Sequence, residues 1–192
     1  MQPHSPPLAT RLLEVIENDI LPLTRQGVAA GNKVFGAAIL RRDDLSLVHA
    51  ATNQEHSNTC PMWHGEMVAL HGFFALPDRP PEQECLLLST HEPCPMCAAA
   101  TAWCGIPQVF FLFDYQDTET QFAIPHDIAI LRQLFAPATR LNYKNEFFAA
   151  AAIQSLALDT ADTARIKNIY QQYDALSAIY QAEKEHNAIP LK

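Results

Sequence analysis

The chain has 192 residues, of which 48% are hydrophobic and 18% are charged, and this suits one compact globular domain with an elaborated end. Its 13 basic and 21 acidic side chains give a formal net charge of −8, a negative field that disfavours extended RNA or DNA as a partner. No apolar run approaches the roughly 18–20 residues that a membrane span needs. Five cysteines, an odd number, and no signal-peptide pattern over residues 1–10 predict reduced thiols and a cytoplasmic location.

The first half of the chain alternates between helical and strand-like patterns. Apolar residues recur at helical spacing over residues 8–30, and Pro22 marks a kink or a break in that helix. Two apolar runs around a polar turn are typical of a β-hairpin. The predicted elements are a helix at 8–30, strands at 33–41 and 45–51, a loop at 53–62 and a helix at 63–74.

The second half continues the alternation and then becomes mixed. Its predicted elements are strands at 85–89 and 108–113, helices at 94–104, 127–134 and 145–156, a loop at 114–120, and a long amphipathic helix at 160–185. A helix between two short apolar strands indicates parallel crossovers and an α/β sheet. We expect a main domain at residues 1–156 and a helical extension at 157–192, which packs on the core or at a dimer interface.

Two short motifs carry the chemistry of the sequence. His64 and Glu66 form an H-x-E pattern, and Cys94 and Cys97 follow Pro93 in a P-C-x-x-C pattern. One imidazole and two thiolates make three strong zinc ligands, which leaves the fourth tetrahedral position to water. Bound zinc lowers the pKa of that water to roughly 7, and a nearby carboxylate can move its proton. We therefore expect His64, Cys94 and Cys97 to bind Zn²⁺, and Glu66 to act as the general acid and base.

Each motif stands at the start of a predicted helix. Helix N-termini carry free N–H groups and partial positive charge, which stabilise thiolates and a bound hydroxide. Two such starts that face each other would place His64 opposite Cys94 and Cys97. The competing interpretation is a closed, non-catalytic zinc module, in which a fourth protein ligand such as Cys60 completes the site.

With these motifs the chain resembles the cytidine and deoxycytidylate deaminase superfamily, and within it the branch of bacterial guanine deaminases and tRNA adenosine deaminases. The resemblance runs over residues 12–113. Residues 35–37 match the family's P-F-G-A strand apart from its proline, and residues 90–97 are close to its T-x-E-P-C-x-M-C pattern. Asn53 lies eleven residues before His64, where the family carries an asparagine that binds the base.

The resemblance implies a fold, a cofactor and a set of roles. The fold is a three-layer α/β/α sandwich with a mixed five-stranded sheet, the cofactor is zinc, and the family is usually dimeric. Asn53, Phe35 and Trp103 are the residues expected to hold the base. Trp103 favours a guanine deaminase, because tRNA adenosine deaminases tend to have histidine at that position.

Departures from the family pattern bear on the substrate. Gly65 replaces the alanine of H-A-E, and the residues at 60–63 replace a common D-P-T-A. Bacterial guanine deaminases carry a second catalytic carboxylate after the last core strand; Asp127 is the best candidate by position, and Asp114 and Asp117 are weaker ones. A second interpretation of the C-terminal region makes part of it a lid over the site.

The sequence therefore predicts a zinc-dependent hydrolase that removes an exocyclic amine from a free nucleobase and releases ammonia, with guanine as the substrate and xanthine as the product. Cytosine, an aminotriazine or the wobble adenosine of tRNA are alternative substrates. The alternative from a different class is the structural zinc module. The expected partners are a small nucleobase and a second copy of the chain, and neither nucleic acid nor a membrane is expected.

Overall fold

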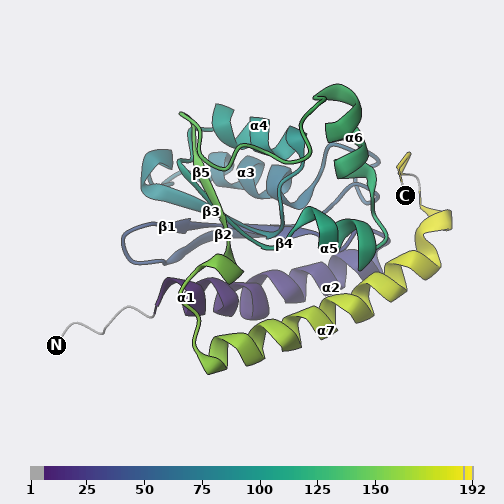
Figure 1. Ribbon diagram of the computed structural model, residues 1–192, viewed down its shortest axis with the longest axis horizontal. Coiled ribbons are helices and arrows are strands. Elements are labelled where there is room, and N and C mark those ends of the chain that lie inside the picture. The colour runs from purple at the N-terminus through teal and green to yellow at the C-terminus, as the bar shows by residue number, and fades with distance from the viewer. Residues whose placement is uncertain (1–6, 188, 192) are drawn as a thin grey trace.

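In the computed structural model, which describes residues 7–187 and 189–191, the chain forms one sheet between two layers of helices (Figure 1). The strands, in spatial order, are β2 (Leu47–Thr52), β1 (Gly36–Arg41), β3 (Cys85–His91), β4 (Gln108–Phe113) and β5 (Ala149–Ala152). β1 runs antiparallel to β2 and β3, whereas β4 runs parallel to β3 and β5. The predicted three-layer sandwich with a mixed five-stranded sheet is confirmed.

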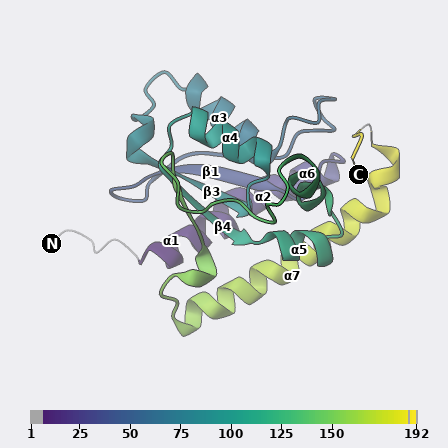
Figure 2. The same cartoon turned by 45° about the horizontal axis from the view of Figure 1, so that its top comes forward.

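One face of the sheet is covered by helices from both ends of the chain. The N-terminal helix consists of α1 (Leu8–Val15), a π-helical turn η1 (Ile16–Ile20) and α2 (Leu21–Ala29). It lies against the long helix α7 (Thr160–Glu183), as Figure 2 shows. The helix expected over residues 8–30 is confirmed, and its π-helical turn, which ends two residues before Pro22, marks where the hydrogen bonding changes.

The opposite face carries the two helices that start at the motifs. α3 (Gly65–Ala75) packs on β1 and β2, and α4 (Pro95–Trp103) lies beside α3. Leu70 and Phe73 of α3 meet Ile39 of β1 in the core on this side. Because strand side chains alternate between the two faces, the neighbours of Ile39 along β1 belong to the core on the other side.

Two predictions for the region after β4 are wrong. The polar stretch 114–120 forms helix α5 (Tyr115–Thr120), because Asp114 and Asp117 make a capping box at its start. Residues 145–156, expected as a helix, form β5 and the 3-10 turn η3 (Ile153–Ser155). Alanines favour a helix in isolation, but here their backbone groups pair with the open edge of β4.

The rest of the chain frames the sheet. The remaining elements are the 3-10 turn η2 (Glu82–Glu84), helix α6 (His126–Leu134) and the 3-10 turn η4 (Lys184–His186). Within the described ranges, no helix combines the length and the apolar character that crossing a membrane requires. The buried Tyr173 and Tyr180 of α7 share one core with α1 and the sheet, and a domain boundary at 156–157 stays a prediction.

Candidate metal centre and pocket

The two motifs meet because each stands at the start of a helix on the same face of the sheet. His64 is the last residue before α3, and Cys94 is the last residue before α4. Glu66 and Cys97 follow in the first turns of these two helices. The free N–H groups at both helix starts put partial positive charge beside the thiols.

The three predicted ligands form a cluster that fits a zinc ion. Nδ1 of His64 is 3.5 Å from Sγ of Cys94 and 3.6 Å from Sγ of Cys97. Zinc bonds of about 2.3 Å to sulfur and about 2.0–2.1 Å to nitrogen, at tetrahedral angles, would separate sulfur and nitrogen by about 3.6 Å. The three ligand atoms all lie within 4.8 Å of one another. The donor set and its spacing therefore match this metal.

The cluster offers three protein ligands and, among the described residues, no fourth. Cys60, the candidate for a closed site, does not belong to the cluster and is a half-buried free thiol. Structural zinc sites have four protein ligands, whereas catalytic sites have three and keep one position for water or substrate. The geometry favours a catalytic site.

The protons of the cluster are unequally shared. The hydrogen bond from Cys97 lowers the pKa of Cys94 well below its ordinary value, and His64 contributes in the same direction. Burial and the neighbouring Cys94 raise the pKa of Cys97 well above its ordinary value. Burial lowers the pKa of His64, but the hydrogen bond and charge of Cys94, together with the charges of Glu66 and Glu55, outweigh it and raise this pKa to about 9. A metal ion that binds here must displace these protons, because its ligands have to be deprotonated.

Glu66 is buried beside the ligands. Its Oε1 accepts a hydrogen bond from Ser89 Oγ at 3.1 Å, and its Oε2 accepts one from the Cys97 thiol at 3.5 Å. Burial, followed by the charge of Cys94, raises the pKa of this carboxyl group. A carboxyl group that is fixed next to the ligands can take up a proton and return it within the site.

A cavity of about 150 Å³ adjoins His64 and Cys94. Its wall includes Phe35, which is buried directly before β1, and Asp127, which lies in the first turn of α6. Burial, followed by the charge of Cys94, raises the pKa of Asp127 to about 7. The structure thus brings two of the expected substrate contacts to the metal centre.

The other carboxylate candidates lie elsewhere. Asp114 and Asp117 bond each other's backbone N–H groups at the start of α5, and neither lines the cavity. Asp117 also accepts a hydrogen bond from the Tyr170 hydroxyl at 2.8 Å. Asp127 is therefore the carboxylate after β4 that faces the metal centre.

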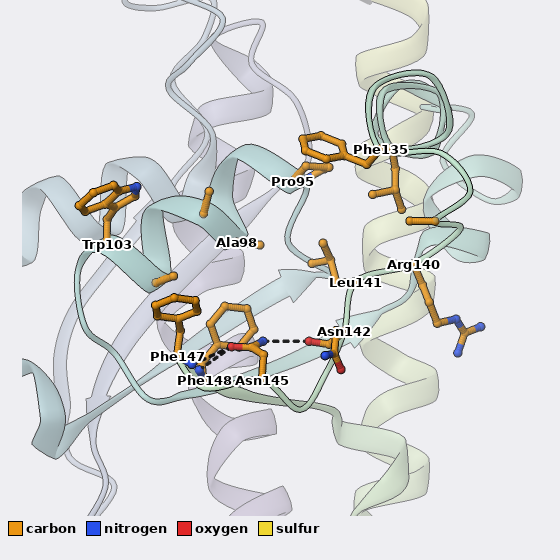
Figure 3. A pocket seen from close by; sticks show the side chains of 14 residues that line it. Pro95, Ala98, Trp103, Phe135, Arg140, Leu141, Asn142, Asn145, Phe147 and Phe148 are labelled. Carbon is orange, nitrogen blue, oxygen red and sulfur yellow. Dashed lines mark hydrogen bonds between the residues drawn. The ribbon is translucent and has the colours of Figure 1, made fainter.

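Asn53 and Trp103 are not part of the cavity wall. Asn53 is fully buried, where its side-chain amide donates to Oε2 of Glu55 at 2.8 Å. Trp103 is 91% exposed in the last turn of α4 and lines a separate apolar groove of about 630 Å³. Figure 3 shows Trp103 at one edge of this groove and Phe135 at the opposite edge. Base binding by either residue stays a prediction.

The cavity wall also contains Lys33 and Glu55, which the sequence motifs did not predict. Both side chains are buried, and Nζ of Lys33 is 3.3 Å from Oε1 of Glu55. Lys33 stands two residues before the segment 35–37 that matches the family, and Glu55 stands two residues after Asn53. A charged residue close to each matched segment was the signal in the sequence that could have indicated this pair.

Glu92 is a further buried carboxylate, and it supports the segment before Cys94. It accepts hydrogen bonds from the Tyr143 hydroxyl at 2.6 Å and from the backbone N–H of Tyr115 at 3.2 Å. The Tyr115 hydroxyl donates to the carbonyl oxygen of Pro93 at 2.7 Å. These contacts fix the segment that leads into Cys94, and they account for the glutamate of the T-x-E-P-C pattern.

A three-layer α/β fold with a His–Cys–Cys cluster at two helix starts defines a zinc protein of the catalytic kind. A family model described as the cytidine and deoxycytidylate deaminase zinc-binding region matches residues 18–113, half of the chain. The chain belongs to this family.

Comparison with individual proteins extends the likeness. The guanine deaminase of Bacillus subtilis (strain 168) is 29% identical over 96 residues, which are 50% of this chain and 60% of the length of that relative. A solved structure of guanine deaminase from Nitrosomonas europaea is similar with a TM-score of 0.56 at 20% identity, over 88% of this chain and 85% of that chain. The solved structure of the Bacillus subtilis enzyme gives 0.55 at 22% identity, over 81% and 91%. These two structures share the fold well beyond the region that the family model matches.

Proposed function

We propose that the protein is a zinc-dependent hydrolytic deaminase, which removes an exocyclic amine from a free nucleobase and releases ammonia. The main support for this proposal is the position of the Glu66 carboxyl group beside the three zinc ligands, with its Oε2 3.5 Å from Cys97 Sγ. Among free bases we propose guanine, which would yield xanthine, because the similar proteins from Bacillus subtilis and Nitrosomonas europaea are guanine deaminases.

Each residue of the centre has its own task in this reaction. Zinc, when held by His64, Cys94 and Cys97, supplies a polarised water that loses a proton near neutral pH. Glu66 accepts a proton from the attacking water and delivers it to the departing amine, so oxygen replaces nitrogen on the ring and ammonia leaves. Ser89 holds Oε1 of this carboxyl group, which leaves Oε2 on the side of the metal ligands.

The cavity suits a small flat ring. Phe35 offers an aromatic surface and Asp127 offers a carboxyl group, so the ring can be held by one apolar and one polar contact. We assign Asp127 as the second carboxyl group that exchanges protons with the substrate. The net charge of −8 disfavours a tRNA strand as substrate.

Ammonia release by the zinc-loaded protein tests the proposal. The panel contains guanine, adenine, cytosine and an aminotriazine, and each nucleobase is paired with its nucleoside. We expect turnover of guanine but not of guanosine. Turnover of another free base would change the substrate within the same class, whereas no turnover of any free base would contradict the proposal.

Replacing Glu66 by glutamine separates catalysis from metal binding. The variant Glu66→Gln keeps the shape of the side chain but cannot carry the proton. We expect unchanged zinc content and a loss of turnover of about 10²–10⁴-fold or more. Ser89→Ala is the matched control, because it removes one hydrogen bond and keeps the carboxyl group, and its loss should be smaller. Full activity of Glu66→Gln would exclude this mechanism.

We also propose a homodimer that forms through the apolar groove of Figure 3. Trp103 is 91% exposed and Phe147 is 60% exposed there, and contiguous apolar surface of this kind marks protein–protein contacts. Pro95 lines both the groove and the cavity, so a second copy in the groove would border the metal centre. Light scattering should give twice the chain mass of 21.4 kDa, and Trp103→Glu should give the monomer. A monomeric parent protein would contradict this.

We further propose that the protein works in the cytoplasm. All five cysteines are free thiols, and two of them are metal ligands that oxidation would destroy. Recovery of the native protein in secreted or membrane fractions of the cell would count against this location.

A further inference from the structure

We propose that Glu55 is a positioning residue of the metal centre. Its carboxylate holds the ring of His64 with Nδ1 turned toward the two cysteines, while Lys33 and Asn53 keep this carboxylate in place. Neither Lys33 nor Glu55 belongs to the motifs that carry the family resemblance. The inference rests on the proposed function only in that His64, Cys94 and Cys97 are taken as the zinc ligands.

The orientation of His64 is the first step. Its Nδ1 lies 3.5 Å and 3.6 Å from the two sulfur atoms, and its Nε2 lies 3.6 Å from Oε1 of Glu55 on the other side of the ring. A ligating histidine is neutral, so one nitrogen binds the metal and the other carries the proton. The proton therefore belongs on Nε2, where it faces the carboxylate. Carboxylate, histidine and metal in this order fix both the tautomer and the orientation of the ring.

Glu55 itself is not a ligand. None of its oxygen atoms joins the cluster in which the ligand atoms lie within 4.8 Å of one another. Oε1 is shared between Nζ of Lys33 at 3.3 Å and His64, and Oε2 accepts the side-chain amide of Asn53 at 2.8 Å. The carboxylate is thus already occupied by groups that orient it toward the histidine.

The backbone around Glu55 is fixed as well. Its N–H donates to Oδ1 of Asn53 at 3.0 Å, and the N–H of Asn53 donates to the carbonyl oxygen of Phe35 at 2.8 Å. Asn32 clamps the loop from the other side, because its Oδ1 accepts the N–H of His56 at 2.9 Å. The loop after β2 is therefore tied to the segment before β1 at the position from which Glu55 reaches His64.

The opposite charges of Lys33 and Glu55 explain why the two side chains are buried together. A carboxylate as deeply buried as that of Glu55 is strongly disfavoured unless a cation or several donors accompany it. Lys33 provides an ammonium group and Asn53 an amide donor, so both buried oxygen atoms of Glu55 have polar partners beside His64. Asn53, expected from the family pattern to bind the base, has in this chain a direct contact with the support of a metal ligand.

Zinc affinity, measured by competition with a chromophoric chelator at neutral pH, tests the inference. Glu55→Gln keeps the size of the side chain and removes its charge, and we expect zinc affinity to fall about 10–100-fold. The cobalt-substituted variant should also show a shifted ligand-field spectrum, because the imidazole is no longer held in one orientation. Asp162→Asn is the matched control. It removes a buried carboxylate at the start of α7, so its zinc affinity and cobalt spectrum should stay unchanged even where its melting temperature falls.

Glu55→Asp provides the second variant. It keeps the charge but withdraws the carboxylate from His64, so it should lower zinc affinity in the same direction, and it decides the matter if Glu55→Gln does not fold. Zinc affinity within twofold of the parent, with an unchanged cobalt spectrum, would overturn the inference. Because both readouts are taken without substrate, an inactive parent protein would refute the proposed function and leave the role of Glu55 to be decided by the metal data.

Discussion

Gly65 is the position where one added methyl group should disturb the metal centre most. It is the first residue of α3 and lies between the ligand His64 and Glu66. A Cβ atom built at this position would lie 2.8 Å from Cα, 3.0 Å from N and 3.1 Å from the carbonyl carbon of Gly36. The obstacle is the backbone of β1, which is paired on both sides and cannot yield. The start of α3 has to move instead.

The size of the effect follows from these distances. Carbon atoms in contact prefer about 3.5–4.0 Å, so the helix start must shift by roughly 0.7 Å or more. Overpacking of this kind destabilises a core by about 1–3 kcal/mol, while alanine in a helix recovers up to about 1 kcal/mol relative to glycine. We expect Gly65→Ala to lose about 1–2 kcal/mol of stability. In a chain of this length that lowers the melting temperature by about 2–8 °C.

The assay combines denaturant unfolding with zinc competition. Displacement of His64 should weaken zinc binding, by about tenfold for each 1.4 kcal/mol of binding free energy that is lost. Gly72→Ala is the control, because the nearest atoms to its new Cβ belong to the ring of His49, a side chain that can turn away. A Gly65→Ala protein with parental stability and parental zinc affinity would refute the reasoning. The result bears on the family as well, because its usual pattern has alanine at this position.

Two further outcomes follow from the buried groups. Zinc removal by a chelator should lower the melting temperature by about 5–10 °C, because zinc at a hundredfold its dissociation constant stabilises the folded chain by about 2.7 kcal/mol. The His64→Ala protein should not respond to the chelator. A similar drop in that variant would contradict the assignment of His64 as a ligand. Burial lowers the pKa of His91 well below 6.5. Below pH 6.5 the unfolded chain therefore binds a proton on this histidine that the folded chain does not bind. The free energy of unfolding should then fall as the pH drops, by up to about 1.4 kcal/mol per pH unit. In denaturant unfolding between about pH 5 and 6.5, His91→Phe should flatten this dependence; an identical slope in both proteins would show that His91 does not contribute.

The metal ligands could be predicted because zinc chemistry restricts residue types and spacing. His64, Cys94 and Cys97 meet as expected, and the hairpin and the crossover strands follow from runs of apolar residues. The alanine-rich run of β5 misled the prediction, since alanine favours a helix and only the unpaired edge of β4 makes a strand preferable. Edge pairing is a property of the assembled sheet, and the local sequence does not contain it.

The direction of single side chains was the other feature that the sequence motifs did not predict. Trp103 stands six residues after Cys97 on one helix, which turns it to a different side of α4 by roughly 120°. The family pattern predicts that Trp103 holds the base, and in this structure its side chain lines the groove. Lys33 and Glu55, 22 residues apart in the chain, come together only because the loops that carry them are clamped side by side. Such pairs depend on tertiary packing.

The cover that α7 gives to α1 and α2 has a consequence for synthesis on the ribosome. The N-terminal helix is made first, but the helix that packs on it begins only at Thr160, after the whole sheet has emerged. Translation at about 5–20 residues per second separates the two events by roughly 7–26 s. During that interval the apolar side of α1 and α2 that later meets α7 is open to solvent and to neighbouring chains. The apolar side of α1 and α2 therefore gains its cover only after residues 160–183 have been made.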